Sequence, residues 1–452
     1  SSEDRSLHHR ACPRGTGVNS VSVPDRAENV RVTTLDNGLR VVSEMMPGLA
    51  TVAMGIWSGA GSRHERAEEQ GLAHLLEHMA FKGTSRRSAL QIAEEIEAVG
   101  GEVNAETNTE YTAYYARTLG PDMPLAVDIL TDILADPAYD ATELKREKDV
   151  ILQEIGAYED TPDEVVFDMV METAFAGAPI GRRILGTPKT VRAQNPKTMR
   201  GFMNRTYRLP SMVVSAAGAI DHESLIQEVG SRLSVFSHDT ALAPESALYT
   251  GGDSRRVKSL EQAHLVFGFR APSWRDPDHY AMHVFSNLLG GGMSSRLFQE
   301  VREKRGLCYE IYSFFSPFSD SGFFAIYGGT GEAQLPDYTP LVLDTLTEAT
   351  KSVTPAEVAR AKAQMKMSLL TALESPGRRA EQMARHMLAY GRVLPRDEMV
   401  AMIDAITVDD VCRVASASLT APPTVAAIGP IKPLIDVDAM AARIGAPLPS
   451  AG

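Results

Sequence analysis

The sequence has no apolar run that approaches the ~18 residues of a membrane-spanning helix, so we expect no membrane span. Cysteine is also scarce: the 452 residues include three cysteines, Cys12, Cys308 and Cys412, at wide spacing. This odd, small count excludes a disulfide framework and favours a reducing compartment. A chain of this length needs more than one hydrophobic core, so we expect at least two domains.

Basic residues are fewer than acidic residues in this sequence. Lysine and arginine total 45 against 58 aspartate and glutamate residues, which gives a net charge of −13. This balance argues against nucleic acid and anionic membranes as partners, and it favours basic peptides at long range. Residues 1–26 are polar, with no hydrophobic segment and no periodicity, so we expect no intact secretory signal there. We assign this disordered or tag-like segment no fold.

The most informative stretch is GLAHLLEHMAF, from Gly71 to Phe81, which contains the pattern H-x-x-E-H. His74 and His78 are one helical turn apart, so on a helix they share a face and can bind one tetrahedral ion. Glu77 lies beside that face, where its carboxylate can take a proton from a water molecule on the metal. Two imidazoles and a carboxylate are costly to bury unpaired, which favours a metal site over a chance pattern.

A catalytic zinc site usually has three protein ligands and one water molecule, so a third ligand is needed. The segment ELKREKDVILQEIGAYED has helical periodicity and offers Glu143, Glu147 and Glu154. Glu147 and Glu154 are two helical turns apart and share a face. Because surface glutamates are common on helices, this pattern alone leaves the choice of ligand open.

Together these motifs resemble a known family. H-x-x-E-H is the inverzincin signature, and the sequence resembles the pitrilysin-type zinc metallopeptidases, most closely the catalytic beta subunit of mitochondrial processing peptidase and its bacterial homologues. The resemblance covers about residues 30–431 and is most specific in HLLEHMAFKGT, GGEVNAETNTEYTAYYA, REKDVILQEI and LFQEVREKRGLCYEIYS. It implies one zinc ion per chain, held by His74, His78 and Glu154. Glu77 would be the general base, and Glu147 a supporting acid beside the ligands.

The same resemblance implies residues that bind substrate. Arg302 and Tyr309 in the second half match a pair that reaches the substrate near the scissile bond. Tyr309 would donate a hydrogen bond to the developing oxyanion, and Arg302 would hold a substrate carbonyl. In the first half, Asn104 and Ala105 match the edge strand beside the metal, to which a peptide adds as an extra strand.

An acidic pair follows the third ligand. TPDEVVFDMVME carries Glu164 and Asp168 four residues apart on an expected helix. Two carboxylates on one helical face repel each other, which a purely structural helix would avoid. By the resemblance, the pair binds an arginine just upstream of the cleaved bond, because two carboxylates can hold a guanidinium. A solvated helix face is the alternative.

The second half of the sequence repeats the first at an offset of about 210 residues. HLVFGF echoes VAMGIW, and TVAAIGPI echoes MVVSAAGAI, so that Gly429 corresponds to Gly218. The repeat carries Asn287 and Gly291 where the first half has its histidines, so it holds no zinc site. We expect an α+β fold of two similar domains from an internal duplication, each a mainly antiparallel sheet packed with helices, together forming a clam-like half-chamber. The predicted divisions are 1–26 as the N-terminal segment, 27–237 as the zinc-binding peptidase domain, 238–257 as a linker, and 258–452 as the homologous domain without metal.

The sequence as a whole predicts a zinc endopeptidase that cleaves extended peptides, with a basic residue near the cleaved bond. Because one chain holds both halves of the site, a homodimer is favoured over a heterodimer. Two alternatives remain: an active subunit of a heterodimeric processing peptidase, and a non-catalytic scaffold like the core proteins of respiratory complexes. The resemblance implies the bacterial cytoplasm, which we slightly prefer, or the mitochondrial matrix.

Overall fold

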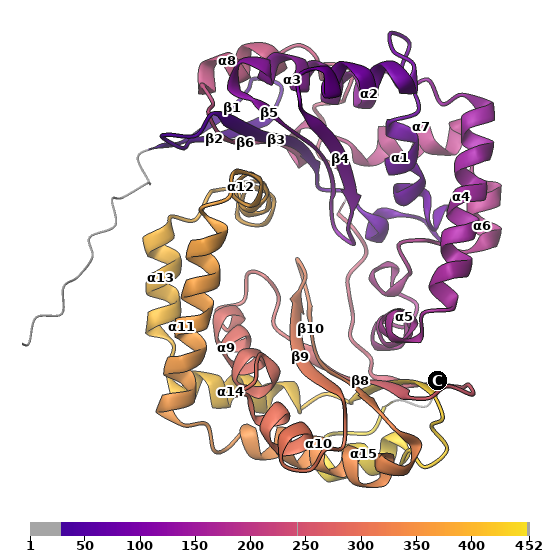
Figure 1. The fold of residues 1–452 in the computed structure, drawn as a ribbon, viewed down its shortest axis with the longest axis vertical. Helices are drawn as coiled ribbons and strands as arrows, with labels where there is room; N and C mark the ends of the chain where they lie inside the picture. The colour runs from indigo at the N-terminus through magenta and orange to yellow at the C-terminus, as the bar shows by residue number, and fades with distance from the viewer. Residues whose placement is uncertain (1–28, 242, 450–452) are drawn as a thin grey trace, which may run out of the picture.

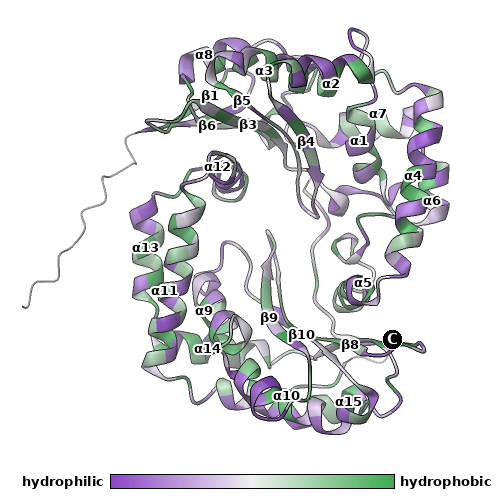
Figure 2. Ribbon diagram, in the orientation of Figure 1, coloured by the Kyte–Doolittle hydropathy of each residue, from purple (hydrophilic) through white to green (hydrophobic). Residues whose placement is uncertain are grey.

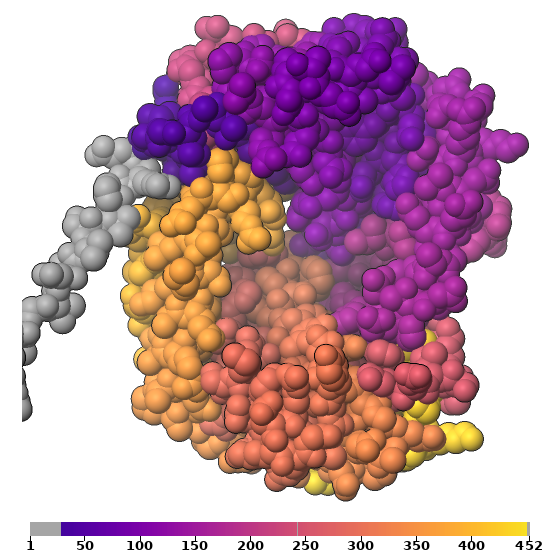
Figure 3. Space-filling view, in the orientation of Figure 1, coloured from indigo at the N-terminus to yellow at the C-terminus, as the bar shows by residue number. Residues whose placement is uncertain are grey.

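The computed structural model describes residues 29–241 and 243–449. The predicted segment 1–26, with Cys12, lies outside them. Two sheets, each covered by helices, face one another across a central hollow (Figures 1 and 3). This arrangement confirms the predicted α+β architecture of two similar domains. Among the helices in the described parts of the chain, none combines the length and apolarity that crossing a bilayer requires.

The first sheet has six strands in the order β1-β2-β6-β3-β5-β4. β2 and β6 run parallel, whereas all other neighbours run antiparallel. Its strands are β1 (Val30–Thr34), β2 (Arg40–Met45), β3 (Thr51–Ser58), β4 (Glu102–Thr107), β5 (Thr112–Leu119) and β6 (Met212–Gly218). The helices of this half are α1 (Leu72–Ala80), α2 (Ala89–Ala98), α3 (Met123–Ala135), α4 (Ala141–Glu159), α5 (Pro162–Ala174), α6 (Pro188–Ala193), α7 (Pro196–Thr206) and α8 (His222–Val229).

The second sheet has five strands in the order β7-β11-β8-β10-β9. Its strands are β7 (Gly252–Val257), β8 (Ala263–Ala271), β9 (Glu310–Pro317), β10 (Gly322–Thr330) and β11 (Thr424–Gly429). The helices of this half are α9 (His279–Gly290), α10 (Leu335–Ala349), α11 (Pro355–Ala372), α12 (Pro376–Tyr390), α13 (Arg396–Ala405), α14 (Val408–Ser418) and α15 (Val437–Ile444).

The two sheets repeat one topology. Without β1, the first sheet has the same strand order and the same parallel and antiparallel pairings as the second. Gly218 and Gly429 end the equivalent strands β6 and β11 with φ of 117° and 125°. An added Cβ there would lie 2.3 Å from the Thr51 carbonyl oxygen and 2.6 Å from that of Gln262. Both turns therefore require glycine, which supports the internal duplication inferred from the sequence.

The structure corrects the predicted linker 238–257. Its last part forms β7, which pairs in parallel with β11 at the edge of the second sheet. The sequence GDSRRV is polar, and its residues are half-buried or exposed, because an edge strand needs no apolar alternation. The irregular connection therefore ends before Gly252, and the other domain limits remain predictions.

One helix from each half of the chain packs on the sheet of the other half. α5 packs against β7, β8 and β11, and α12 packs against β2, β3 and β6. α12 is largely hydrophilic in Figure 2, yet its stripe of Ala380, Met383, Ala384 and Met387 is buried against the first sheet. A buried ion pair between Glu44 of β2 and Arg379 of α12 reinforces this contact. The exchange ties the two sheets into one unit.

Candidate metal centre

The H-x-x-E-H stretch forms helix α1, as predicted. One face of α1 is buried in the core of the first half, and the helix packs against α4, α7 and β4. His74, Glu77 and His78 are half-buried on the other face. The apolar positions therefore anchor the helix, and the polar positions are free to act together.

The first turn of α1 is fixed by a buried acid. Gly71 precedes the helix with φ of 88°, and an added Cβ would lie 2.8 Å from the Leu185 carbonyl oxygen. The Glu65 carboxylate accepts hydrogen bonds from the N–H groups of Gly71 at 3.0 Å and Ala73 at 2.7 Å. Burial raises the pKa of Glu65 to about 8, and these two donors oppose the shift. The sequence analysis missed Glu65, because its spacing from the helix matches no capping pattern.

Three side chains converge where α1 faces α4. The Nε2 atoms of His74 and His78 lie 3.9 and 3.7 Å from one carboxylate oxygen of Glu154. Among the described residues, this is the only set of three histidine, cysteine or acidic side chains whose ligand atoms converge, all within 4.8 Å of one another. These distances are too long for hydrogen bonds but leave room for an ion with bonds of ~2.0–2.2 Å. Two imidazoles and one carboxylate also fit the donor set of a catalytic zinc.

The electrostatics suit a metal site. Burial, with a smaller effect of His78, lowers the pKa of His74 to about 4, so that its imidazole is neutral at pH 7, as a metal ligand must be. The Nδ1 atom of His78 lies 3.1 Å from Glu147, and Lys82 lies 2.7 Å from the other oxygen of Glu147. Burial alone would raise the pKa of Glu147, but hydrogen bonds with Lys82 and His78 hold it below its usual value. Glu147 thus contacts the His78 ring from α4, where the sequence resemblance predicts a supporting acid.

Glu77 lies on α1 beside these ligands. Its carboxylate makes no hydrogen bond or ion pair with the described residues. Burial, the charge of Glu381 and, to a smaller extent, that of Glu77 raise the pKa of Glu106 on β4. The helix α1, which carries Glu77, packs against this strand.

β4 is an edge strand of the first sheet, as the sequence resemblance implied. Its last residue, Thr107, donates a hydrogen bond of 3.4 Å to the Ala73 carbonyl oxygen in α1. Asn104 is exposed, and Ala105 is buried and donates its N–H to the Asn104 side chain at 2.8 Å. The free edge of the sheet therefore runs alongside the metal helix.

Arg302 and Tyr309 share a pocket to which none of His74, His78 and Glu154 contributes. They line a separate pocket of about 410 Å³ beside a π-helical turn at Phe298–Glu303. The Arg302 guanidinium stacks 4.5 Å from the Phe298 ring and 5.7 Å from the Tyr309 ring, and Tyr309 is 78% exposed. The structure thus brings these two residues together, but not with His74, His78 and Glu154.

The acidic pair lies on α5, as predicted. Glu164 is exposed, and Asp168 is half-buried 3.5 Å from Arg183, which also pairs with Glu159 and with Glu172. Burial raises the pKa of Asp168 to about 6, although a Tyr158 hydrogen bond and the Arg183 charge oppose this. The sequence analysis missed Arg183, since nothing local to RRILGT indicates its partners. One of the two carboxylates therefore already has a guanidinium partner within the chain.

Comparison with known proteins identifies the family. Residues 40–188, which include the metal ligands, match the family described as insulinase (peptidase family M16), and residues 195–365 match the peptidase M16 inactive domain. A zinc protease of Streptomyces coelicolor, described as uncharacterized, is 40% identical over 413 residues, which cover 89% of this chain and 90% of the relative. Another zinc protease with this description, from Bacillus subtilis, is 38% identical over 399 residues, with 88% and 97% covered.

Solved structures agree with this fold. A peptidase M16 inactive domain from Pseudomonas fluorescens superposes with a TM-score of 0.81 at 21% identity, over 89% of this chain and 98% of that one. A protease from Helicobacter pylori gives a TM-score of 0.80, also at 21% identity, over 88% and 99%. The fold, the converged ligands and the relatives lead to one conclusion: this chain belongs to peptidase family M16 and is a zinc metallopeptidase.

Proposed function

We propose that the protein is a zinc endopeptidase that cleaves extended peptides in the hollow between its two sheets. The observation that carries this proposal is the convergence of His74, His78 and Glu154 on the helix that carries Glu77, whose carboxylate has no ion pair among the described residues. The free edge of β4 passes the same helix, and it offers backbone groups to a peptide that adds as a further strand. Substrate backbone and metal ligands would then meet at one place.

Each residue of this site has a distinct role in the proposal. One zinc ion per chain, held by His74, His78 and Glu154, would supply Lewis acidity toward a water molecule and the scissile carbonyl. Glu77 accepts the proton of the attacking water and passes it to the leaving amine. Glu147 holds the His78 ring through Nδ1.

Substrate is positioned by groups farther away. Asn104 and Ala105 present the strand edge, and Glu164 with Asp168 receives an arginine side chain upstream of the cleaved bond. The net charge of −13 favours approach of such basic peptides. Arg183 would have to release Asp168 when the substrate guanidinium binds. Because that contact is lost, the arginine side chain contributes little to the free energy of binding.

We further propose a homodimer in which Arg302 and Tyr309 of one copy serve the metal centre of the other. Within one chain the pocket that these residues line has none of the metal ligands in its wall. The exchanged helices α5 and α12 oppose a large closing motion of the two halves, which favours supply by a second copy. A heterodimer with an unlike partner would use the same chemistry.

The intact set of proposed metal ligands argues against the alternative of a non-catalytic scaffold. The bacterial relatives favour the bacterial cytoplasm as the compartment.

A product analysis tests this function. The purified protein is incubated with a mixture of unstructured peptides, with zinc or with a chelator, and the products are sequenced by mass spectrometry. We expect internal cleavage that the chelator stops and added zinc restores. Glu77→Gln, prepared identically, reveals any contaminating protease. Removal of single terminal residues only, or cleavage that survives in Glu77→Gln, would overturn the proposal.

A further inference from the structure

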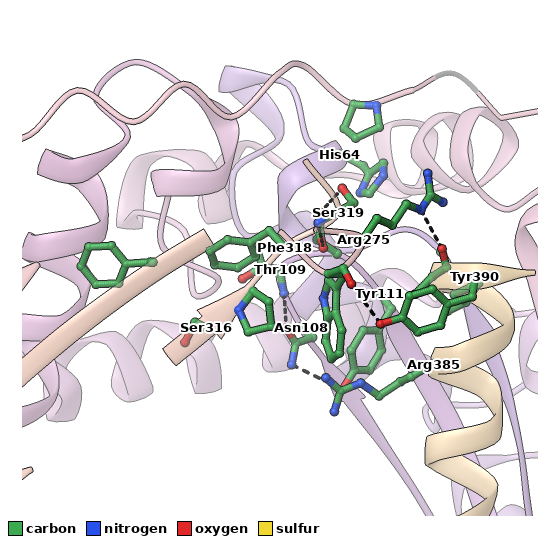
Figure 4. A pocket seen from close by; sticks show the side chains of 18 of the residues that line it. His64, Asn108, Thr109, Tyr111, Arg275, Ser316, Phe318, Ser319, Arg385 and Tyr390 are labelled. Carbon is green, nitrogen blue, oxygen red and sulfur yellow. Dashed lines mark hydrogen bonds between the residues drawn. The ribbon is translucent and has the colours of Figure 1, made fainter. Parts of the chain in front are cut away.

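The free edge of β4 ends at Thr107. In the turn that follows, the Asn108 carbonyl oxygen accepts a hydrogen bond of 3.2 Å from the N–H of Ser62. The Thr109 carbonyl oxygen accepts one of 2.9 Å from the N–H of Arg63. Both turn residues border the cavity between the two halves of the chain, which Figure 4 shows. A strand that adds to β4 can therefore pair with β4 itself but not with the turn beyond it.

The backbone groups that β4 offers to such a strand follow from its pairing with β5. Asn108 donates its N–H to the Tyr111 carbonyl oxygen at 2.8 Å, so these two residues form a hydrogen-bonded pair. Hydrogen-bonded pairs alternate along an antiparallel ladder, and the register places Glu106 opposite Ala113 as the next one. Glu106 therefore bonds to β5 through its backbone, whereas Ala105 directs its N–H and C=O away from β5. Ala105 is thus the central point of contact for an added strand.

The side chains of Glu106 and Ala105 stand on opposite faces of the sheet. Ala105 is buried in the core that contains α1, whereas Ala113, the partner of Glu106, packs in the cluster with α12. In an added strand, the residue opposite Glu106 has its side chain on the same face as Glu106, with the two Cβ atoms about 4.5–5.5 Å apart. Glu106 would therefore contact one defined side chain of the substrate.

The Glu106 carboxylate is half-buried and has no counter-charge. It accepts a hydrogen bond of 3.2 Å from the Tyr111 hydroxyl and forms no ion pair with the residues that the structure describes. Burial, followed by the charge of Glu381, raises the pKa of Glu106, as expected for a carboxylate without a cation beside it. Arg385, beside the Tyr111 ring in Figure 4, pairs with Glu381 at 3.3 Å instead. The charge of Glu106 is therefore left unbalanced.

Another glutamate of β4 shows what is missing at Glu106. Glu102 lies opposite Arg117 of β5, and the two side chains form an ion pair of 2.6 Å. The residue of β5 opposite Glu106 is Ala113, which has no charge. A cross-strand cation for Glu106 can therefore come only from its other side, which is the free edge where an added strand would lie.

We propose that Glu106 selects a basic side chain, lysine or arginine, at the substrate residue that pairs opposite it, one position from the residue opposite Ala105. The proposal rests on the proposed peptidase function and names a substrate residue other than the arginine assigned to α5. A single carboxylate makes no forked contact, so lysine serves as well as arginine here. This tolerance of lysine separates the position from the one that Glu164 and Asp168 would bind.

Binding to the zinc-loaded, inactive variant Glu77→Gln tests this selection without catalysis. Peptides of twelve residues, with no other charged side chain, carry lysine, methionine or glutamate at each position in turn, and titration calorimetry gives their affinities. At one position we expect lysine to bind roughly fivefold more tightly than methionine, which is of similar length but uncharged. Glutamate at the same position should bind more weakly than methionine, because two carboxylates would then lie side by side.

Variants of β4 decide whether Glu106 causes this preference. In the same background, Glu106→Gln should reduce the lysine-to-methionine ratio to about one, and Glu106→Lys should make glutamate the preferred residue. Glu102→Gln is the matched control and should leave the ratio unchanged, because Glu102 is paired with Arg117 of its own chain. The double variant Glu164→Gln with Asp168→Asn should leave it unchanged as well. If Glu106→Lys fails to fold, Glu106→Gln alone decides.

The outcomes separate this selection from the peptidase function. No preferred position, or a ratio that Glu106→Gln leaves unchanged, would overturn the role of Glu106. An equal loss of affinity for all three peptides in Glu106→Gln would overturn it too, since that result indicates a structural role only. Cleavage by the wild-type chain would still support the peptidase proposal in these cases. The expected preferences without any cleavage by the wild-type chain would support the contact with Glu106 and refute the peptidase proposal.

Discussion

Arg63 and Asp320 form an ion pair of 2.6 Å between the loop that leads to the metal helix and the turn that joins β9 to β10. The same guanidinium donates to the Glu245 carbonyl oxygen at 2.7 Å, in the connection between the halves. One buried side chain therefore joins three segments that are far apart in sequence. Glu65, which caps the metal helix, is only two positions further along the chain, so the contact between the halves is linked to the start of that helix.

Asp320→Asn should lower the free energy of unfolding by about 1–3 kcal/mol, because a buried guanidinium loses a charged acceptor. The measurement is urea unfolding of the zinc-free protein followed by circular dichroism. Asp344→Asn is the matched control: its partner Arg443 is on the surface, and an exposed pair contributes about 1 kcal/mol or less. Equal effects of the two changes would contradict a special role for the Arg63 contact.

Substitution of Glu154 and of Glu147 on α4 should have different effects on zinc binding, because we propose that Glu154 is a ligand and that Glu147 only orients His78. Glu154→Gln should lower zinc content sharply after dialysis, since it removes a charged ligand. Glu147→Gln should keep most of the zinc and weaken affinity about 10–100-fold, because it only loosens the orientation of His78. Zinc is measured by atomic emission and by competition with a chromophoric chelator. Full zinc content in Glu154→Gln would exclude it as the third ligand.

Local spacing was sufficient to place His74 and His78 on one face of a helix, whereas Glu154 was chosen by the family resemblance, and the structure brings its carboxylate near both imidazoles. These residues lie on two helices whose registers follow from helical periodicity, and the roles of Glu154 and Glu147 remain predictions from the resemblance. The repeat of Gly218 at Gly429 likewise predicted a repeated topology, because a strained turn needs the same residue twice. Structural features that depend on one short segment, or on the repeat of that segment in the second half, can thus be predicted from the sequence.

Contacts between distant segments were not predictable in this way. Arg63 has acidic neighbours in its own loop, so its partners in the other half leave no local signal. The apolar stripe of α12 indicates that one face is buried, but not that the face packs on the sheet of the other half. The polar edge strand β7 was assigned to a linker for a similar reason, because its pairing with β11 involves backbone groups alone.

The second half should lose stability in mild acid. Burial lowers the pKa of His279 to about 3 and those of His283 and His386 to about 4. The unfolded chain takes up protons on these rings below pH ~6.5, whereas the folded chain does not. Stability is therefore complete above that pH and falls as pH decreases toward 4, by up to about 1.4 kcal/mol per pH unit for each ring.

Urea unfolding at pH 7 and pH 5, with a chelator present, measures this loss. His283→Phe should reduce the difference between the two pH values by up to about 2 kcal/mol, because a ring that cannot titrate replaces the histidine. His238→Gln, at an exposed position, is the control and should leave the difference unchanged. A loss of the same size in His283→Phe and wild type would contradict this assignment.

Mixing two inactive variants should restore activity if the homodimer proposal is right. Arg302→Ala should reduce kcat by about 10²–10³ through loss of substrate stabilisation, and Glu77→Gln should abolish turnover. In a mixed dimer one site combines an intact Glu77 with an intact Arg302, so about a quarter of wild-type activity should return after random exchange of subunits. A mixture of Glu77→Gln with Glu154→Gln is the control and should remain inactive. No recovery in the first mixture would assign Arg302 to its own chain.

The acidic pair on α5 decides whether the enzyme prefers arginine. If Glu164 and Asp168 bind a substrate guanidinium, the double variant Glu164→Gln with Asp168→Asn should raise KM for arginine peptides roughly tenfold, with a smaller effect on neutral peptides. Lysine should substitute poorly, since it cannot make a forked contact. Glu172→Gln is the control, because it also lies beside Arg183 on α5 but is outside the pair. Since Arg183 already neutralises part of this site, an unchanged ratio of arginine to neutral kcat/KM would mean that the pair serves Arg183 alone, and selectivity would then depend on other contacts.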